Sequence, residues 1–122
     1  MDTTEASCHC GKVKITVPST TKTITSCNCS ACAKYAALCA YFSPTDVNVS
    51  VLSDSLSSYC WGDKTIKFHH CKNCGCVIHY TPTALGNENR MAVNFRLVNT
   101  DIVKKLDIRY FDGADTWQEI KR

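Results

Sequence analysis

The sequence predicts a mainly β fold, a single domain of short antiparallel strands that bound metal stabilises. The first observation is that short β-branched or alternating runs recur between turn signals along the 122 residues. The second is that the chain has ten cysteines, which is about 8% of its residues and far above ordinary usage. Short strands bury limited apolar area, so metal is the expected source of additional stability. The length fits one domain over residues 1–122 and leaves no room for two separate cores.

The expected strands are apolar or β-branched runs, and a proline follows or interrupts several of them, as is typical where strands stop. Residues 12–17 give the clearest pattern, because apolar and polar side chains alternate there and would lie on opposite faces. Two short stretches can form helices: the alanine-rich segment after Cys29, and residues 100–106. The other expected strands are residues 38–42, 47–51, 66–68, 77–80 and 91–95.

Composition and charge exclude several classes of protein. Fourteen Lys and Arg residues against eleven Asp and Glu residues give a net charge of +3. This charge is too weak and too scattered to predict binding to nucleic acid or anionic lipid. No apolar run of about 18 residues is present to span a membrane, and residues 1–10 lack the pattern of a signal peptide. We therefore expect a cytoplasmic protein whose partners include neither nucleic acid nor membrane.

Most of the cysteines fall in three tight clusters, which favours metal binding over disulfides. Ten thiols in a reducing compartment are poor candidates for five disulfides, and cysteines one to three residues apart are poorly placed to bridge each other. The same spacings suit thiolates that converge on one small ion. The alternatives are a disulfide framework in an exported protein and redox dithiols. The clusters are Cys8-x-Cys10, Cys27-x-Cys29-x-x-Cys32 and Cys71-x-x-Cys74-x-Cys76, with Cys39 and Cys60 isolated.

The first and third clusters together predict a structural zinc site. A structural zinc is usually four-coordinate and takes all four ligands from the protein. Cys71 and Cys74 flank a tight turn before Gly75, whose backbone tolerates angles that a side chain resists. Cys8 and Cys10 offer a second pair of thiols. Joining the pairs closes a loop of about sixty residues, and a metal clip gains most in loop entropy from long loops.

The middle cluster has three cysteines, Cys27, Cys29 and Cys32. Three protein ligands with one open position are typical of a catalytic zinc. Two alternatives are open: Cys39 or a histidine closes the site and makes it structural, or the cluster binds no metal.

Three motifs and two later segments occur in the order and spacing of one family. They are Ser7-Cys8-His9-Cys10-Gly11-Lys12-Val13, Cys27-Asn28-Cys29-Ser30-Ala31-Cys32, His70-Cys71-Lys72-Asn73-Cys74-Gly75, Val93-Asn94-Phe95-Arg96 and Tyr110-Phe111-Asp112-Gly113. Together they closely resemble the glutathione-dependent formaldehyde-activating enzyme family, which also contains centromere protein V. The resemblance implies a mainly β zinc fold with two Zn²⁺ ions per chain. It implies structural zinc ligands at Cys8, Cys10, Cys71 and Cys74, and ligands of the second zinc at Cys27, Cys29 and Cys32.

The family resemblance implies a carbon–sulfur lyase-type activity on a thiol–aldehyde adduct, like that of S-(hydroxymethyl)glutathione synthase. A glutathione-like thiol and an aldehyde such as formaldehyde are the implied partners. The ligand chemistry agrees, since a zinc with three thiolates is a weak Lewis acid and its open position suits a soft thiolate. The alternative is a non-catalytic zinc domain that binds a protein or nucleic acid. Such a binder is expected to have a basic extension, which this sequence lacks.

Several other residues near the motifs receive structural interpretations. Cys76 stands where the family commonly has a small hydroxyl residue, and we interpret it as a core thiol; an extra ligand or a thiol facing the second zinc are the alternatives. Cys39 and Cys60 are expected to be buried and inert. His79 is expected to face solvent, and no histidine is assigned a catalytic role. Tyr35 is expected to line the mouth of the middle cluster.

Overall fold

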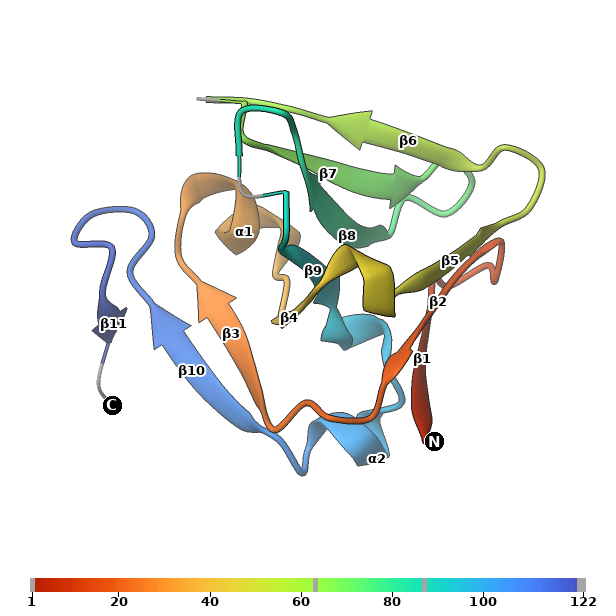
Figure 1. The fold of residues 1–122 in the computed structure, drawn as a ribbon, viewed down its shortest axis with the longest axis horizontal. Coiled ribbons are helices and arrows are strands. Elements are labelled where there is room, and N and C mark those ends of the chain that lie inside the picture. The colour runs from red at the N-terminus through yellow and green to blue at the C-terminus, as the bar shows by residue number, and fades with distance from the viewer. Residues whose placement is uncertain (1, 63, 87, 121–122) are drawn as a thin grey trace.

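Two β-sheets of unequal size form the structure, a computed structural model that describes residues 2–62, 64–86 and 88–120. The first residue and the last two of the predicted domain, residues 1–122, lie outside the described residues. The smaller sheet is antiparallel and stands at the right in Figure 1. In spatial order its strands are β1 (Thr3–Ser7), β2 (Val13–Pro18) and β5 (Asn48–Val51).

The larger sheet curves from β10 at the left of Figure 1 to β6 at the top. Its neighbouring strands are antiparallel except for β3 and β10, which run parallel and pair Cys27 with Phe111. The mainly β class with antiparallel sheets is thus confirmed. The strands in spatial order are β11 (Glu119–Ile120), β10 (Asp107–Phe111), β3 (Thr23–Cys27), β4 (Cys39–Phe42), β9 (Met91–Asn94), β8 (Val77–Pro82), β7 (Ile66–Cys71) and β6 (Leu56–Tyr59).

Short helices fill the connections between strands. Helix α1 (Ser30–Tyr35) follows β3, and α2 (Thr100–Val103) precedes β10, so both helices form where the sequence predicted them. Two 3₁₀ turns, η1 (Pro44–Asp46) and η2 (Phe95–Leu97), complete the connections. Within the described residues, no helix is both long and apolar enough to cross a membrane.

The main core joins the two sheets. Strand β2 alternates as predicted, with Val13, Ile15 and Val17 buried and Lys14 exposed. These side chains share one apolar cluster with Phe95 and with residues of β3, β4, β8 and β9. A smaller apolar cluster lies apart from this core and contains Cys32, Ala37, Cys39, Phe68, Tyr80 and Ala92.

All six runs that the sequence predicted as strands form strands, in β2, β4, β5, β7, β8 and β9. Of the remaining strands of the described residues, β10 contains Ile108, Tyr110 and Phe111 and resembles the predicted runs, whereas the others are short or mostly polar. Strand β3, for example, is rich in Thr and Ser, yet its Ile24 and Thr25 are buried between β10 and β4. The strands without a sequence prediction are β1, β3, β6, β10 and β11.

His79 does not face solvent, so that prediction is wrong. Its pairing strand β7 shifts register just after His69, and the irregularity leaves Ile78, His79 and Tyr80 buried in succession. The His79 ring stacks on the His69 ring with 4.5 Å between centroids. Its Nδ1 is buried without a hydrogen-bond partner among the described residues. Burial, with a smaller contribution from His69, lowers the pKa of His79 to about 3.

Replacing His79 with Phe should make the protein less sensitive to acid. Because the ordinary pKa of 6.5 is lowered in the folded protein, the unfolded state binds the extra proton, and stability falls as the pH drops below about 6.5. The contribution is at most about 1.4 kcal/mol per pH unit. We expect urea unfolding to show a gap between variant and wild type that widens from pH 7 to pH 4.5. A gap that is the same at both pH values would contradict the buried neutral histidine.

Candidate metal centres

Two turns from different sheets bring four cysteines together. Cys8 and Cys10 lie between β1 and β2, while Cys71 ends β7 and Cys74 lies in the turn to β8. Each turn contains a glycine with a φ of 82°, which a side chain would resist. The glycine N–H donates to the carbonyl of the first cysteine, at 3.1 Å for Cys8 and 2.9 Å for Cys71. The two turns differ in length by one residue, but both are closed by a glycine N–H that bonds the carbonyl of the first cysteine.

The sulfur atoms of this four-cysteine cluster fit one tetrahedral metal ion. All four lie within 4.8 Å of one another, and the Cys10 sulfur is 3.6 Å from those of Cys8 and Cys71. A tetrahedral zinc with Zn–S bonds of about 2.3 Å places its sulfurs about 3.8 Å apart, whereas a disulfide needs about 2 Å. All ten cysteines are free thiols, so the structure does not support a disulfide framework.

Hydrogen bonds from neighbouring groups stabilise negative charge on two of the four sulfur atoms. The Val13 N–H donates to the Cys8 sulfur at 3.4 Å, although burial still raises the pKa of the Cys8 thiol to about 11. The Asn73 side chain lowers the pKa of Cys10, the exposed member of the cluster. Several thiolates at this separation repel one another strongly. A divalent cation bound among the four sulfur atoms would offset this repulsion.

The three-cysteine cluster is built around the start of α1. Cys27 ends β3, Cys29 caps the helix, and Cys32 lies in its first turn. The Cys29 N–H donates to the Cys27 sulfur at 3.5 Å, and the Cys32 N–H donates to the Cys29 sulfur at 3.4 Å. All three sulfur atoms lie within 4.8 Å of one another. A strand end and one helical turn thus supply three converging thiols.

Cys39 lies beside this cluster without joining it. It hydrogen-bonds the Cys32 thiol and, together with burial, raises the pKa of that thiol. Among the described residues, however, the group of sulfurs within 4.8 Å of one another has three members and does not include Cys39. Burial raises the pKa of Cys27 to about 11, so these thiols carry protons at neutral pH and would release them to a metal. The geometry favours three protein ligands over four.

A pocket of about 410 Å³ opens over the three-cysteine cluster. Two guanidinium groups enter it: Arg90 stacks on the Tyr41 ring at 4.3 Å, and Arg109 lies 5.5 Å from the Phe111 ring centre. The sequence did not predict these residues, because they come from separate elements and belong to no motif of their own. Besides the three cysteines, the lining residues are Tyr41, Ile66, Tyr80, Arg90, Arg109, Phe111 and Trp117.

The loop after β10 forms one wall of this pocket and is held against the cluster. The Asn28 side-chain amide donates to the Asp112 carboxylate at 3.0 Å and accepts from the Ala114 N–H at 3.0 Å. Gly113 packs so closely that a Cβ there would lie 2.5 Å from the Cys27 sulfur. Phe111 and Trp117 meet edge to face across the loop at 5.1 Å. The segment Tyr110-Phe111-Asp112-Gly113 is therefore part of the site.

The other predicted residues occupy different environments. Cys76 is half-buried, packs against the main core and lies beside Cys74, outside the group of four sulfurs. Cys39 is buried as predicted, whereas Cys60 is half-buried and donates to the Ile66 carbonyl at 3.2 Å. Tyr35 does not line the pocket over the three cysteines. It lines a separate cavity beside Tyr59 and Trp61, and its ring contacts the Phe68 ring at 5.2 Å between centroids with a tilt of 52°.

Both cysteine clusters can hold a metal ion. Soft thiolate donors select ions such as zinc, and the sulfur separations suit its tetrahedral coordination. Comparison with known proteins also supports metal binding by the cysteines. The model of the family described as glutathione-dependent formaldehyde-activating enzyme matches residues 3–110. Among curated proteins, none matches the chain.

The fold is also similar to that of a Rhodobacter sphaeroides protein with a known crystal structure. The two chains superpose with a TM-score of 0.70 and are 27% identical in sequence. The similarity covers 85% of this chain and 98% of the other.

Replacing Gly113 with Ala should weaken metal binding at the three-cysteine cluster alone. The new methyl group would meet the Cys27 sulfur at 2.5 Å, so either the thiol rotates out of the cluster or the loop moves away. We expect zinc titration to show weakened affinity for one of two equivalents. Gly62→Ala is the control for a glycine substitution away from the cluster: a Cβ there meets nothing within 4 Å, and because its φ of 62° adds backbone strain, zinc affinity rather than stability is compared. Two full-affinity equivalents in Gly113→Ala would contradict this packing.

Proposed function

The chain belongs to the glutathione-dependent formaldehyde-activating enzyme family, and on that premise we propose that it is a zinc-dependent enzyme of the carbon–sulfur lyase type. Its substrate is the adduct of a glutathione-like thiol with an aldehyde such as formaldehyde. The reaction forms or breaks the bond between the thiol sulfur and the aldehyde carbon. In the forming direction, the thiol proton is replaced on sulfur by carbon, and the carbonyl oxygen ends as a hydroxyl.

The two zinc ions have unequal roles in this proposal. Cys8, Cys10, Cys71 and Cys74 complete a four-thiolate shell, which leaves no position for a substrate and makes that site structural. Cys27, Cys29 and Cys32 supply three thiolates and leave one position open. The observation that carries the proposal is that these three thiols line a pocket large enough for a small molecule.

At the open site, zinc would supply Lewis acidity that lowers the pKa of the incoming thiol or polarises the aldehyde oxygen. The side chains that line the pocket supply the other interactions with the substrate. The Arg90 guanidinium and the Tyr80 hydroxyl line the pocket, and they share a hydrogen bond. Donors of this kind stabilise negative charge that develops on an aldehyde oxygen when sulfur attacks its carbon.

The aromatic side chains of the pocket restrict water around the reacting groups. Tyr41, Tyr80, Phe111 and Trp117 line it, and burial raises the pKa of both tyrosines. These hydroxyls therefore keep their protons at neutral pH and act as hydrogen-bond donors. A pocket of low polarity also strengthens each electrostatic contact inside it.

Serine substitutions should separate the two zinc sites. Cys71→Ser removes one of four structural ligands, and because structural zinc contributes folding free energy directly, we expect insoluble or molten protein. Cys32→Ser should lose about one zinc per chain and keep the fold, since Cys32 belongs to the smaller apolar cluster. Metal content and circular dichroism measure both outcomes. A Cys71→Ser variant with wild-type melting temperature and two zinc ions would contradict the structural role.

Catalysis is tested by exchange between glutathione and ¹³C-formaldehyde, followed by NMR and compared with the uncatalysed rate. We expect the zinc-loaded protein to accelerate the exchange and Cys32→Ser to abolish the acceleration. X-ray absorption of the zinc should show an added sulfur neighbour when thiol is present, with Cys39→Ala as the control for a fourth protein ligand. A four-sulfur shell that thiol leaves unchanged, together with no acceleration, would instead favour the non-catalytic zinc domain.

A further inference from the structure

We propose that the pocket over the three cysteines selects thiols that bear a carboxylate, and that Arg109 is the specificity-determining residue that binds this carboxylate. The inference rests on the proposed function for the reacting thiol, and it adds the charge of the substrate and the residue that recognises it. Three observations carry it: the unpaired charge of the pocket, the buried unpartnered nitrogen of Arg109, and a groove that continues from the pocket past Arg109.

The pocket has two guanidinium groups and no carboxylate among its lining residues. Arg90 and Arg109 also take part in none of the ion pairs formed within the described part of the chain. Arg90 is already engaged, because it hydrogen-bonds Tyr80 and stacks on the Tyr41 ring. Arg109 also lies over an aromatic ring, that of Phe111 at 5.5 Å, but its Nε is buried and finds no hydrogen-bond partner in the described structure. A buried guanidinium donor without a partner is unfavourable, and a carboxylate would satisfy it once the Arg109 side chain turns that edge of the guanidinium toward the pocket.

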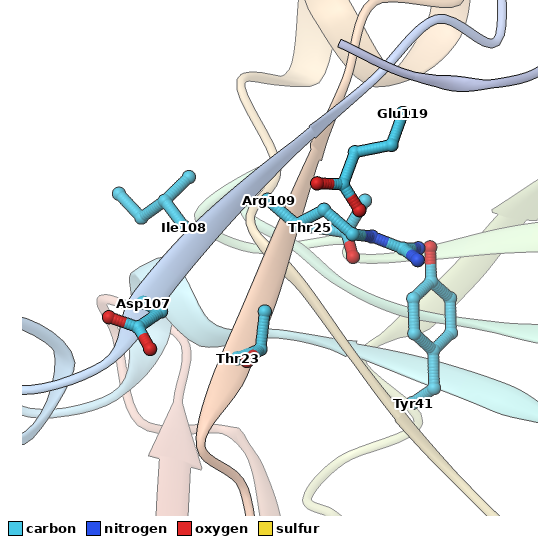
Figure 2. A pocket seen from close by; sticks show the side chains of 7 residues that line it. All are labelled: Thr23, Thr25, Tyr41, Asp107, Ile108, Arg109 and Glu119. Atoms are coloured by element: carbon cyan, nitrogen blue, oxygen red, sulfur yellow. The ribbon is translucent and has the colours of Figure 1, made fainter. Parts of the chain in front are cut away.

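The position of Arg109 fits a role in binding the far end of a substrate. A groove of about 560 Å³ on the other side of Arg109 is lined by Thr23, Thr25 and Glu119 among others. Arg109 and Tyr41 line both the groove and the cysteine pocket. Figure 2 shows the Arg109 side chain pointing from β10 across β3 toward Tyr41. A thiol that reaches the cysteines would therefore lay its remaining chain past Arg109 and into the groove.

The charges around the pocket are also compatible with a carboxylate on the substrate. Three thiolates around a divalent ion carry one net negative charge, and a bound substrate thiolate adds another. The two guanidinium groups that line the pocket balance these two negative charges, so a carboxylate that approaches Arg109 does not meet a site with a net negative charge. A neutral thiol of equal size would leave the Arg109 Nε without its hydrogen bond, which is the kind of mismatch that produces strong discrimination.

The test uses a pair of ligands that differ only in the carboxylate: N-acetyl-S-methylcysteine and its primary amide. Neither has a free thiol, so binding reports on the pocket and not on zinc coordination or turnover. With the zinc-loaded protein, NMR titration should show about tenfold to a hundredfold tighter binding of the acid. Equal affinity for acid and amide in the wild-type protein would overturn the proposal.

Variants then assign the preference to one residue. Arg109→Gln should remove it, and Arg109→Lys, which keeps the charge but loses the planar pair of donors, should retain part of it. Lys14→Gln is the control, because it removes one positive charge from an exposed position on β2 in the other sheet. A preference that survives in both Arg109 variants at full strength would overturn the assignment. Should Arg109→Gln fail to fold, Arg109→Lys with the same ligand pair decides the question.

Turnover separates this inference from the proposed function. If exchange with formaldehyde is accelerated equally for 3-mercaptopropionate and 2-mercaptoethanol, and the acid of the ligand pair binds no better than the amide, the carboxylate preference is wrong and the enzyme proposal stands. If no thiol is turned over but the acid still binds better in an Arg109-dependent way, the enzyme proposal is wrong and the binding site stands. Acceleration that favours 3-mercaptopropionate through KM supports both.

Discussion

The four-cysteine cluster is the constraint on which the rest of the structure depends. Its two pairs of thiols come from turns about sixty residues apart, one in each sheet. Within the described residues, no strand of one sheet pairs with a strand of the other. The isolated bridge of Ala6 is to Val98, which follows η2 and belongs to neither sheet. Apolar packing in the main core holds the two sheets together in one relative position. An ion shared by Cys8 and Cys71 would fix that position, because metal–ligand geometry tolerates little variation.

The three-cysteine cluster lies apart from the residues that hold the two sheets together. It lies outside the main core, in the smaller apolar cluster with Phe68 and Tyr80, and its wall is a loop that hydrogen bonds to Asn28 hold in place. Loss of a ligand here affects few packed side chains. In our proposal the four-cysteine site stabilises the fold and the three-cysteine site binds substrate, so a change at the second should cost less folding free energy than a change at the first.

The spacing of the cysteines predicted both clusters, because ligands one to three residues apart must share a turn wherever the strands go. The alternation of β2 predicted its buried face for an equally local reason. The pocket could not be predicted in this way. Arg90 and Arg109 meet over the cysteines only because β10 pairs parallel to β3 and β9 pairs with β4, and these are long-range pairings. The burial of His79 likewise follows from a register shift between β7 and β8 that no single strand encodes.

In our proposal the two clusters use the same ligand atom for different roles, and the difference lies in the residues that surround them. Four thiolates would fill the coordination shell of a divalent ion and leave a net charge of −2, which N–H donors such as that of Val13 partly offset. Three thiolates leave both a coordination position and a negative charge, and the structure sets two guanidinium groups beside them. Because Arg109 has no anion of its own within the described residues, its charge is available to a ligand. In our proposal, open coordination selects the sulfur of a substrate, and Arg109 selects the molecule that carries it.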